Sequence, residues 1–114
     1  MNSAMLGLRL QMEPIRSLDE GSIADTYAPI GGPLLHPAHL VFTQNLTAGQ
    51  LMFSLDGVND HFTLPAGGFF VMDVTTNKAL GYGFFLASGT QIYVRYITSP
   101  TSGSAYITVV YANT

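Results

Sequence analysis

Two acids, an asparagine and an imidazole lie within six residues in the segment DGVNDH, residues 56–61. Oxygen donors of this kind suit Ca²⁺, but their spacing does not match the calcium loop with its glycine at the sixth and its glutamate at the twelfth position. The dipeptide Asp56–Gly57 is also a turn signal, because glycine readily adopts a positive φ. We therefore expect a β-hairpin here and no metal site.

The three histidines do not form an obvious catalytic or metal-binding pattern. His36 and His39 are three residues apart, but Pro37 disfavours the helix that would align them, and no carboxylate is close in sequence. The pair Asp60–His61 falls in the expected hairpin, and nothing resembles a nucleophile elbow. The chain has no cysteine, which excludes disulfides and thiolate chemistry. The sequence thus predicts a non-enzymatic protein with no catalytic residue, no metal ligand and no cofactor.

Two further patterns each allow two interpretations. Residues 45–47, NLT, match the N-glycosylation acceptor pattern, but without a secretion signal we interpret them as a chance match at a turn. Aromatic residues crowd the C-terminal third, where they could bind sugars or stack on bases; we favour a half-buried sandwich core. They are Tyr82, Phe84, Phe85, Tyr93, Tyr96, Tyr106 and Tyr111.

Charge is scarce and unevenly distributed. Only 10% of the 114 residues are charged, and six of the eleven charged residues lie within the first 25 positions. Small monomers usually stay soluble by spreading many charges over the surface. Either Thr, Ser, Asn, Gln and Gly replace those charges here, or partner subunits cover much of the surface; we favour the second alternative. The sequence therefore predicts a homo-oligomer.

Nucleic acid and membranes are poor partners for this chain. Four basic residues and a net charge of −3 do not supply the cationic cluster that nucleic acid requires. The apolar stretches are far too short to span a membrane. The first twelve residues are not a convincing signal peptide, because Arg9 interrupts them and no small-residue cleavage site follows. We expect a protein that stays in the cell, or in a particle assembled there.

Period-two alternation of apolar residues dominates from residue 39 onward. It predicts strands that Gly-rich turns separate about every ten residues, which is typical of an all-β antiparallel β-sandwich or barrel. No window supports a long amphipathic helix. The expected strands are residues 39–44, 51–55, 61–64, 69–74, 79–86, 91–98 and 105–111. Residues 15–28 are expected to be irregular or to hold one short helical turn, and residues 29–37 to be a loop.

The N-terminus carries the clearest alternation in the sequence. Leu6, Leu8, Leu10 and Met12 alternate with non-apolar residues, which predicts a strand with one buried face. Because Pro14 and an acidic stretch follow, we treat residues 1–26 as an N-terminal arm and residues 27–114 as the sandwich. An isolated strand can close its own sheet or add to that of a neighbour. We expect the four apolar residues to contact another subunit or a capsid.

Several runs of turn and strand residues resemble small structural proteins of tailed bacteriophages. The likeness covers roughly residues 27–112 and includes YAPIG at 27–31, FTQNLT at 42–47, FSLDG at 53–57, LPAG at 64–67, GTQIYV at 89–94 and PTSGSAYI at 100–107. The resemblance implies a β-sandwich, jelly-roll-like, that serves as a non-enzymatic virion component assembled in the host cytoplasm. It transfers no functional residues, because the matching positions are structural.

Three functions suit such a module. A capsid decoration (cement) protein, often a trimer, clamps neighbouring subunits of the major capsid protein, and this is the function we favour. A head–tail connector or tail adaptor forms a ring against the portal or tail proteins. A sugar-binding module of a tail fibre would instead use the tyrosines and the loop 56–60.

Overall fold

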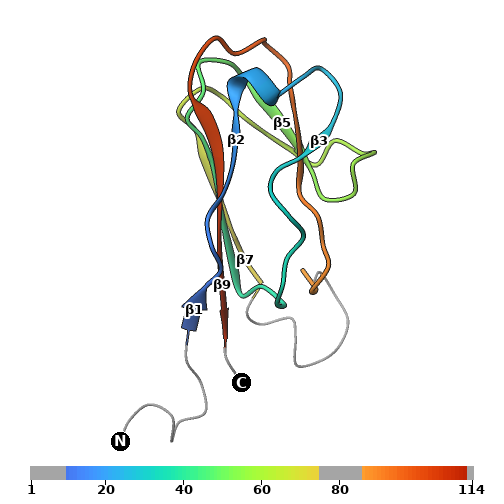
Figure 1. Ribbon diagram of the computed structural model, residues 1–114, viewed down its shortest axis with the longest axis vertical. Helices are drawn as coiled ribbons and strands as arrows, with labels where there is room; N and C mark the ends of the chain where they lie inside the picture. Colours follow the sequence, from blue (N-terminus) through green and yellow to red (C-terminus); the bar gives the residue numbers. More distant parts are fainter. Residues whose placement is uncertain (1–9, 75–85, 113–114) are drawn as a thin grey trace, which may run out of the picture.

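The computed structural model describes residues 10–74 and 86–112, and they form an antiparallel β-sandwich (Figure 1). The first sheet has the strand order β1-β9-β4-β7, and β2 also pairs with β9. The second sheet has the order β3-β8-β5-β6. The first sheet contains β1 (Leu10–Met12), β2 (Arg16–Asp19), β4 (Leu40–Asn45), β7 (Phe69–Asp73) and β9 (Ser104–Ala112). The second contains β3 (Ala28–Pro29), β5 (Leu51–Ser54), β6 (Phe62–Leu64) and β8 (Tyr93–Tyr96).

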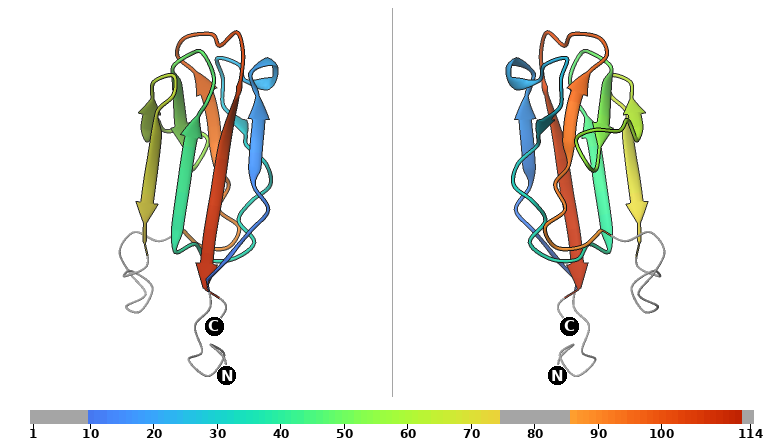
Figure 2. Two further views of the ribbon diagram at one scale, coloured as in Figure 1. Left: turned by 90° about the vertical axis from the view of Figure 1, so that its left-hand side faces the viewer. Right: turned by 90° about the vertical axis from the view of Figure 1, so that its right-hand side faces the viewer.

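The strand order is that of a jelly roll. From β2 to β9 the chain moves from one sheet to the other at every connection except the β5–β6 hairpin. The first and last strands of this series, β2 and β9, lie side by side (Figure 2). β1 pairs with the C-terminal end of β9, on the same side of β9 as β2 (Figure 1). This arrangement of eight strands in two sheets confirms the predicted all-β, jelly-roll-like sandwich.

The core lies between the two sheets and follows from the alternation in the sequence. In β4 the side chains of Val41, Thr43 and Asn45 are buried, while the intervening ones are half-exposed. Phe53 and Leu51 fill the core from the second sheet, and each fully buried side chain of this size stabilises the fold by about 2–3 kcal/mol. Six of the seven strands expected from residue 39 onward are present, with bounds shifted by at most two residues. The expected strand 79–86 falls almost wholly outside the described residues.

Two strands were not expected. β2 lies where the sequence predicted irregular chain, and β3 lies where it predicted a loop. In β2 the inward positions are taken by Arg16 and Leu18, so a buried arginine hides the apolar alternation. β3 is only two residues long and contains Pro29. The expected helical turn is present as a short 3₁₀ helix, η2 (Glu20–Ser22). In the described residues, no helix is long and apolar enough to cross a membrane.

Asn45 is fully buried and joins two connections between strands, residues 46–50 and 65–68, so the acceptor-like pattern at residues 45–47 has a structural role. Its Nδ2 donates to the carbonyl oxygens of Gly49, Leu64 and Pro65 at 2.9–3.0 Å. Its Oδ1 accepts from the backbone N–H and the hydroxyl of Thr47, at 3.0 and 2.7 Å. A side chain with this burial and these partners is inaccessible to a glycan.

Replacing Asn45 by alanine is expected to destabilise the fold by about 3 kcal/mol, because buried carbonyl groups lose their donor. The matched control is Asn59→Ala, which removes one exposed hydrogen bond to Asp56 and is expected to cost less than about 1 kcal/mol. Urea unfolding of both variants measures the difference. Equal losses in the two variants would contradict the structural role of Asn45.

Candidate interaction surface

The outer face of the first sheet carries large apolar side chains on four of its five strands. Residues opposite one another in neighbouring strands share a face, and the alternation of β4 assigns Leu40 and Phe42 to the outside. The register then places Val71 of β7, Val110 of β9 and Met12 of β1 on the same side. We call this surface the apolar outer face; its large side chains are Leu10, Met12, Leu40, Phe42, Phe69, Val71 and Val110. Figure 2 (left) looks onto it.

Much of this face is open to solvent. Leu10, Met12 and Phe69 are 64–69% exposed, and Val71 is 43% exposed. These four side chains alone expose on the order of 450 Å² of apolar surface, as much as the largest patch on a typical monomer. Among the outward-facing strand residues that the structure describes, acids lie only at the ends of strands, at Asp19 and Asp73. A face of this composition is suited to contact with another protein.

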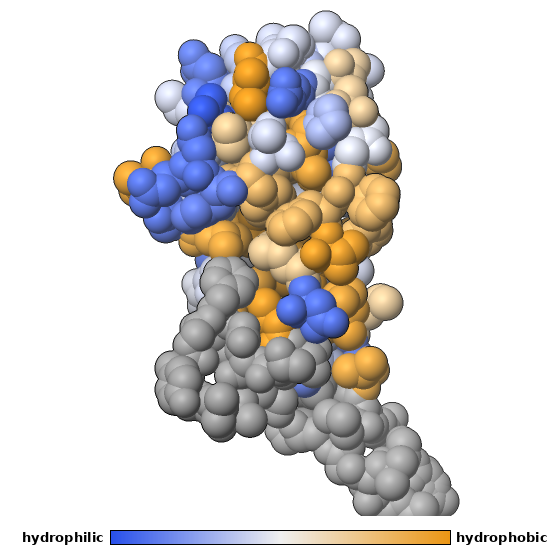
Figure 3. Space-filling view, turned by 180° about the vertical axis from the view of Figure 1, so that it is seen from behind, coloured by the Kyte–Doolittle hydropathy of each residue, from blue (hydrophilic) through white to orange (hydrophobic). Residues whose placement is uncertain are grey.

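The β7 edge extends the apolar surface around the side of the sandwich. Phe69, Phe70 and Val71 are consecutive and all exposed, although they point alternately to the two faces of the sheet. Phe69 packs edge-on against Phe42, and Phe70 contacts Phe62 of β6, with ring centroids 5.6 and 4.8 Å apart. Seen from behind, apolar residues spread over the part of the molecule where β6 and β7 are the outer strands (Figure 3).

β7 also has an unprotected backbone edge. In the described part of the chain β7 pairs only with β4, so its second edge has no strand partner there. Natural proteins usually protect such edges with charges, prolines or bulges. In β7 the sequence FFVM contains none of these residues, and the first charge is Asp73. The β7 edge is therefore a second feature suited to protein contact.

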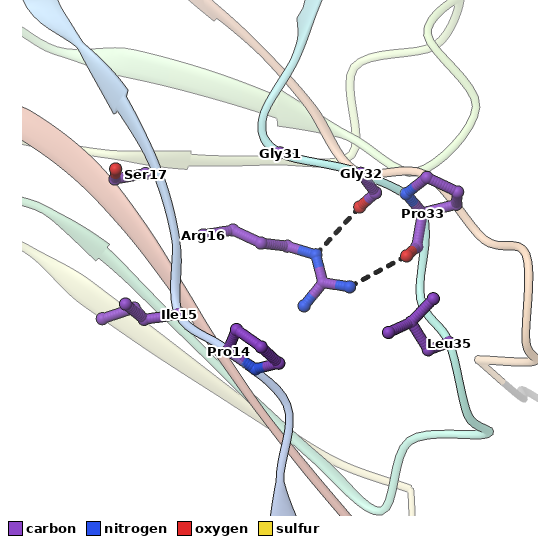
Figure 4. A pocket seen from close by; sticks show the side chains of 8 residues that line it. All are labelled: Pro14, Ile15, Arg16, Ser17, Gly31, Gly32, Pro33 and Leu35. Atoms are coloured by element: carbon purple, nitrogen blue, oxygen red, sulfur yellow. Dashed lines mark hydrogen bonds between the residues drawn. The ribbon is translucent and has the colours of Figure 1, made fainter.

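A pocket of about 480 Å³ lies at the opposite edge of the first sheet, between residues 14–17 and the loop 31–35 (Figure 4). Its lining includes the apolar side chains of Pro14, Ile15 and Leu35. The guanidinium of Arg16 crosses it, and Nε and one terminal nitrogen donate to the carbonyl oxygens of Gly32 and Pro33, both at 2.8 Å. No pattern in the sequence predicts this pocket.

The loop 31–35 can lie this close to Arg16 because residue 31 is a glycine. Gly31 has φ +67°, and a Cβ built there would lie 2.5 Å from Cγ of Arg16. Any other residue would strain the backbone and displace the arginine. The shape of the pocket therefore depends on Gly31 as well as on Arg16.

Glu13 holds the pocket in place. Its buried carboxylate accepts a hydrogen bond from Arg16 at 2.8 Å, and its other oxygen accepts from the backbone N–H groups of Leu35 and His36 at 3.0 and 2.8 Å. That oxygen also lies 2.8 Å from Nδ1 of His36, whose ring stacks on Tyr111 with centroids 3.7 Å apart. Burial raises the pKa of Glu13, but the hydrogen bonds from His36, Arg16 and Leu35 outweigh this effect and hold it below its ordinary value.

The segment 56–61 forms the connection of the β5–β6 hairpin, which confirms the hairpin interpretation. The carboxylate of Asp56 accepts from the backbone N–H groups of Val58 and Asn59 at 2.8 Å, and these bonds hold its pKa below the usual range. Gly57 has φ +79°. Within the described residues, no group of three His, Asp or Glu side chains is placed to hold a metal ion. Asp56 serves to shape the loop.

Asp60 ties this loop to two other segments. Its carboxylate accepts from the hydroxyl of Tyr27 at 2.5 Å and from Arg95 at 3.1 Å, and the Arg95 guanidinium lies 5.5 Å from the centre of the Tyr27 ring. Burial and the hydrogen bond to this carboxylate raise the pKa of Tyr27 to about 12. The same hydrogen bonds lower the pKa of Asp60. This surface cluster was not predicted, because its members are more than 30 residues apart in sequence.

The remaining candidate residues have local roles in the structure. Nδ1 of His61 lies 2.9 Å from the backbone N–H of Leu55, which donates to it, and His39 is buried beside β4. The described tyrosines near the C-terminus are half-buried: Tyr93, Tyr96, Tyr106 and Tyr111. The core interpretation holds for Tyr96, which packs against the buried core, whereas Tyr106 lies opposite Gln44 on the outer side of the first sheet. Tyr82, Phe84 and Phe85 lie outside the described residues.

The four apolar residues of the N-terminal arm are described only in part. Leu6 and Leu8 lie outside the described residues. Leu10 and Met12 lie in β1, which pairs with β9 of its own sheet. The expectation of a buried face is wrong here, because both side chains point away from the core and are exposed. Their contact with a partner stays a prediction.

No protein-family model matches the chain, and none of the curated proteins is similar to it in sequence. Among solved structures, the chain is similar to the Dit protein (gp 19.1) of phage SPP1, described as a paradigm of the hub adsorption apparatus of phages that infect Gram-positive bacteria. The TM-score is 0.40 at 12% identity, and the match covers 92% of this chain and 49% of that one. The chain thus spans about half the length of that protein.

Replacing Glu13 by glutamine is expected to destabilise the fold by about 3 kcal/mol at neutral pH, because Arg16 is left buried without its counter-charge. A lowered pKa in the folded state means that Glu13 adds stability above its ordinary pKa of 4.5, and that this stability is lost as the pH falls through the lowered value. Asp56 and Asp60 act in the same direction. Urea unfolding between neutral and acidic pH should therefore show a shallower acid loss in E13Q; an unchanged slope would contradict the role of Glu13.

Removing or adding divalent cations is expected to leave the melting temperature unchanged, because backbone N–H groups already occupy the Asp56 carboxylate. Thermal unfolding in EDTA and in millimolar CaCl₂ measures this. A rise of several degrees with Ca²⁺ would show that the loop binds the ion and would overturn its interpretation as a plain hairpin.

Proposed function

We propose that this chain is a non-enzymatic structural subunit of a tailed-phage virion, and that within the virion it acts as a capsid decoration protein. The observation that carries the proposal is the apolar outer face, which extends over β1, β9, β4 and β7. A decoration protein binds by a broad surface to neighbouring capsid subunits. A full sheet face with acids only at the ends of its strands supports that mode of binding.

The size of the face supports a permanent partner. A stable interface buries about 800 Å² on each side, of which somewhat more than half is apolar. The apolar surface estimated above meets that apolar share. The scarcity of charge in the sequence and its resemblance to small phage structural proteins point in the same direction.

The polar clusters support a structural role. Glu13 and Asp56 accept hydrogen bonds from the chain's own N–H groups, and Asp60 binds Tyr27 and Arg95. Each cluster joins segments that are distant in sequence or shapes a loop. Their carboxylates therefore have a structural use that requires no substrate.

A ring subunit at the head–tail joint or in the tail is the second candidate. The observation in its favour is that the two edges of the first sheet differ: β7 presents exposed phenylalanines, whereas the edge at residues 14–17 carries a pocket. Unlike edges on opposite sides of a subunit are what a closed ring requires. Copy number in the virion separates the two candidates, because a decoration protein is about as abundant as the major capsid protein and a ring subunit is not.

The test uses expanded, undecorated capsids of the phage that encodes the chain. The wild-type protein is expected to co-sediment with them in large copy number, and Met12→Glu is expected to lose binding because it places a charge in the apolar outer face. Val58→Glu is the control, since Val58 is exposed in the loop 55–61, away from that face. If Met12→Glu folds and still binds as tightly as Val58→Glu, the outer face is not the binding surface.

A further inference from the structure

We infer that the pocket at residues 14–17 and 31–35 receives the β7 edge of a second copy of this chain, so that subunits join head to tail. The occupant is the exposed apolar segment Phe69–Val71 of the neighbouring copy. The inference goes beyond the proposed function, because it names an occupant for the pocket and assigns the β7 edge to a contact between copies of this chain.

The register of the first sheet places the two features at the same height. Arg16 is opposite Ile107, Ile107 is opposite Thr43, and Thr43 is opposite Phe70. By the same register Ser17 of the pocket is level with Phe69 across the sheet. The paired residues between them are Tyr106 of β9 and Gln44 of β4. A sideways displacement of one copy therefore brings Phe69–Val71 level with the pocket.

The strand directions are also compatible. β2 is antiparallel to β9, β9 to β4, and β4 to β7, so β2 and β7 run in opposite directions. A rotation about an axis parallel to the strands does not change these directions. The β7 strand of one copy would then lie antiparallel to β2 of the next, as neighbouring strands do within the sheet.

The chemistry of the pocket fits an aromatic, uncharged occupant. A volume of about 480 Å³ lies within the range of sites that hold organic ligands, and so has room for a phenylalanine ring. Ile15 and Leu35 at its rim are 61% and 63% exposed, and covering them would remove apolar surface from water. Glu13 neutralises Arg16, so an apolar side chain placed over the guanidinium does not bury an uncompensated charge.

The β7 edge has the complementary character. Its three exposed apolar residues present side chains to both faces of the strand, and its outer backbone edge is open within the described residues. The β7 edge and the pocket are different surfaces on opposite edges of one sheet, which makes the contact heterologous. Such a contact generates a closed ring when the rotation closes, and a row of subunits when it does not.

Engineered cysteines test the contact directly, because the chain has no cysteine of its own. Ser17→Cys and Phe69→Cys, made in separate chains and mixed under mild oxidation, are expected to form a disulfide-linked dimer in at least tenfold excess over either variant alone. The double variant is expected to form a ladder of higher oligomers. Val58→Cys mixed with Ser17→Cys is the control and should remain unlinked. Equal linkage in the control and test mixtures would overturn the inference.

Sedimentation of the unlinked protein gives an independent readout. The wild type is expected to self-associate with rising concentration, and both Phe69→Glu and Leu35→Glu are expected to be monomers with unchanged circular dichroism. Their equimolar mixture should form dimers and nothing larger, because only the intact β7 edge of Leu35→Glu and the intact pocket of Phe69→Glu can meet. A wild type that stays monomeric, or a Leu35→Glu variant that associates like the wild type, would overturn head-to-tail joining.

Capsid binding, measured on the same samples, separates this inference from the proposed function. A monomeric wild type that binds capsids refutes the head-to-tail contact and supports the decoration role. A wild type that forms rings and does not bind capsids supports the head-to-tail contact and refutes the decoration role.

Discussion

The Glu13 carboxylate is the interaction on which the edge of the sandwich depends. A buried carboxylate is tolerated only when it is paired and fully hydrogen-bonded, and Glu13 meets this condition with Arg16, His36 and two backbone N–H groups. Those partners come from β2 and from the connection between β3 and β4. The condition therefore fixes the path of two segments that are about 20 residues apart in sequence. The pocket lies between them, and its shape follows from this pairing.

The first sheet has apolar side chains on both faces, which is unusual for an antiparallel sheet with one face in the core. In the common arrangement the second face is polar and solvated. Here β4 places Val41 inside and Phe42 outside, and β7 places Phe70 inside and Val71 outside. Packing within one subunit explains only the inner set. The outer set has a physical reason when another surface covers it, which connects the composition of the chain with assembly.

The sequence was sufficient for six strands of the sandwich from residue 39 onward, because short apolar runs lie there between turn residues, most of which include glycine. It was insufficient for β2, where the inward position belongs to Arg16, a residue that counts as polar in any alternation. It predicted that Leu10 and Met12 contact a partner, but it placed their apolar side towards a core. Alternation shows that two faces differ, and only the register with β9 shows which face is outside. The pocket depends on the Glu13–His36 contact across 23 residues, which no local pattern contains.

The same jelly-roll order that buries the core also leaves unlike edges. Because β2 and β9 are neighbours at one side, the chain closes that side with β1, β2 and the loop 31–35, held by Glu13 and Arg16. The other side ends in β7, which pairs only with β4 among the described strands. An edge as apolar as β7 is an aggregation hazard if nothing covers it. A specific site for it on the opposite edge of the next subunit would convert that hazard into ordered assembly, and the Glu13 pairing that shapes the pocket would then also set how one subunit meets another.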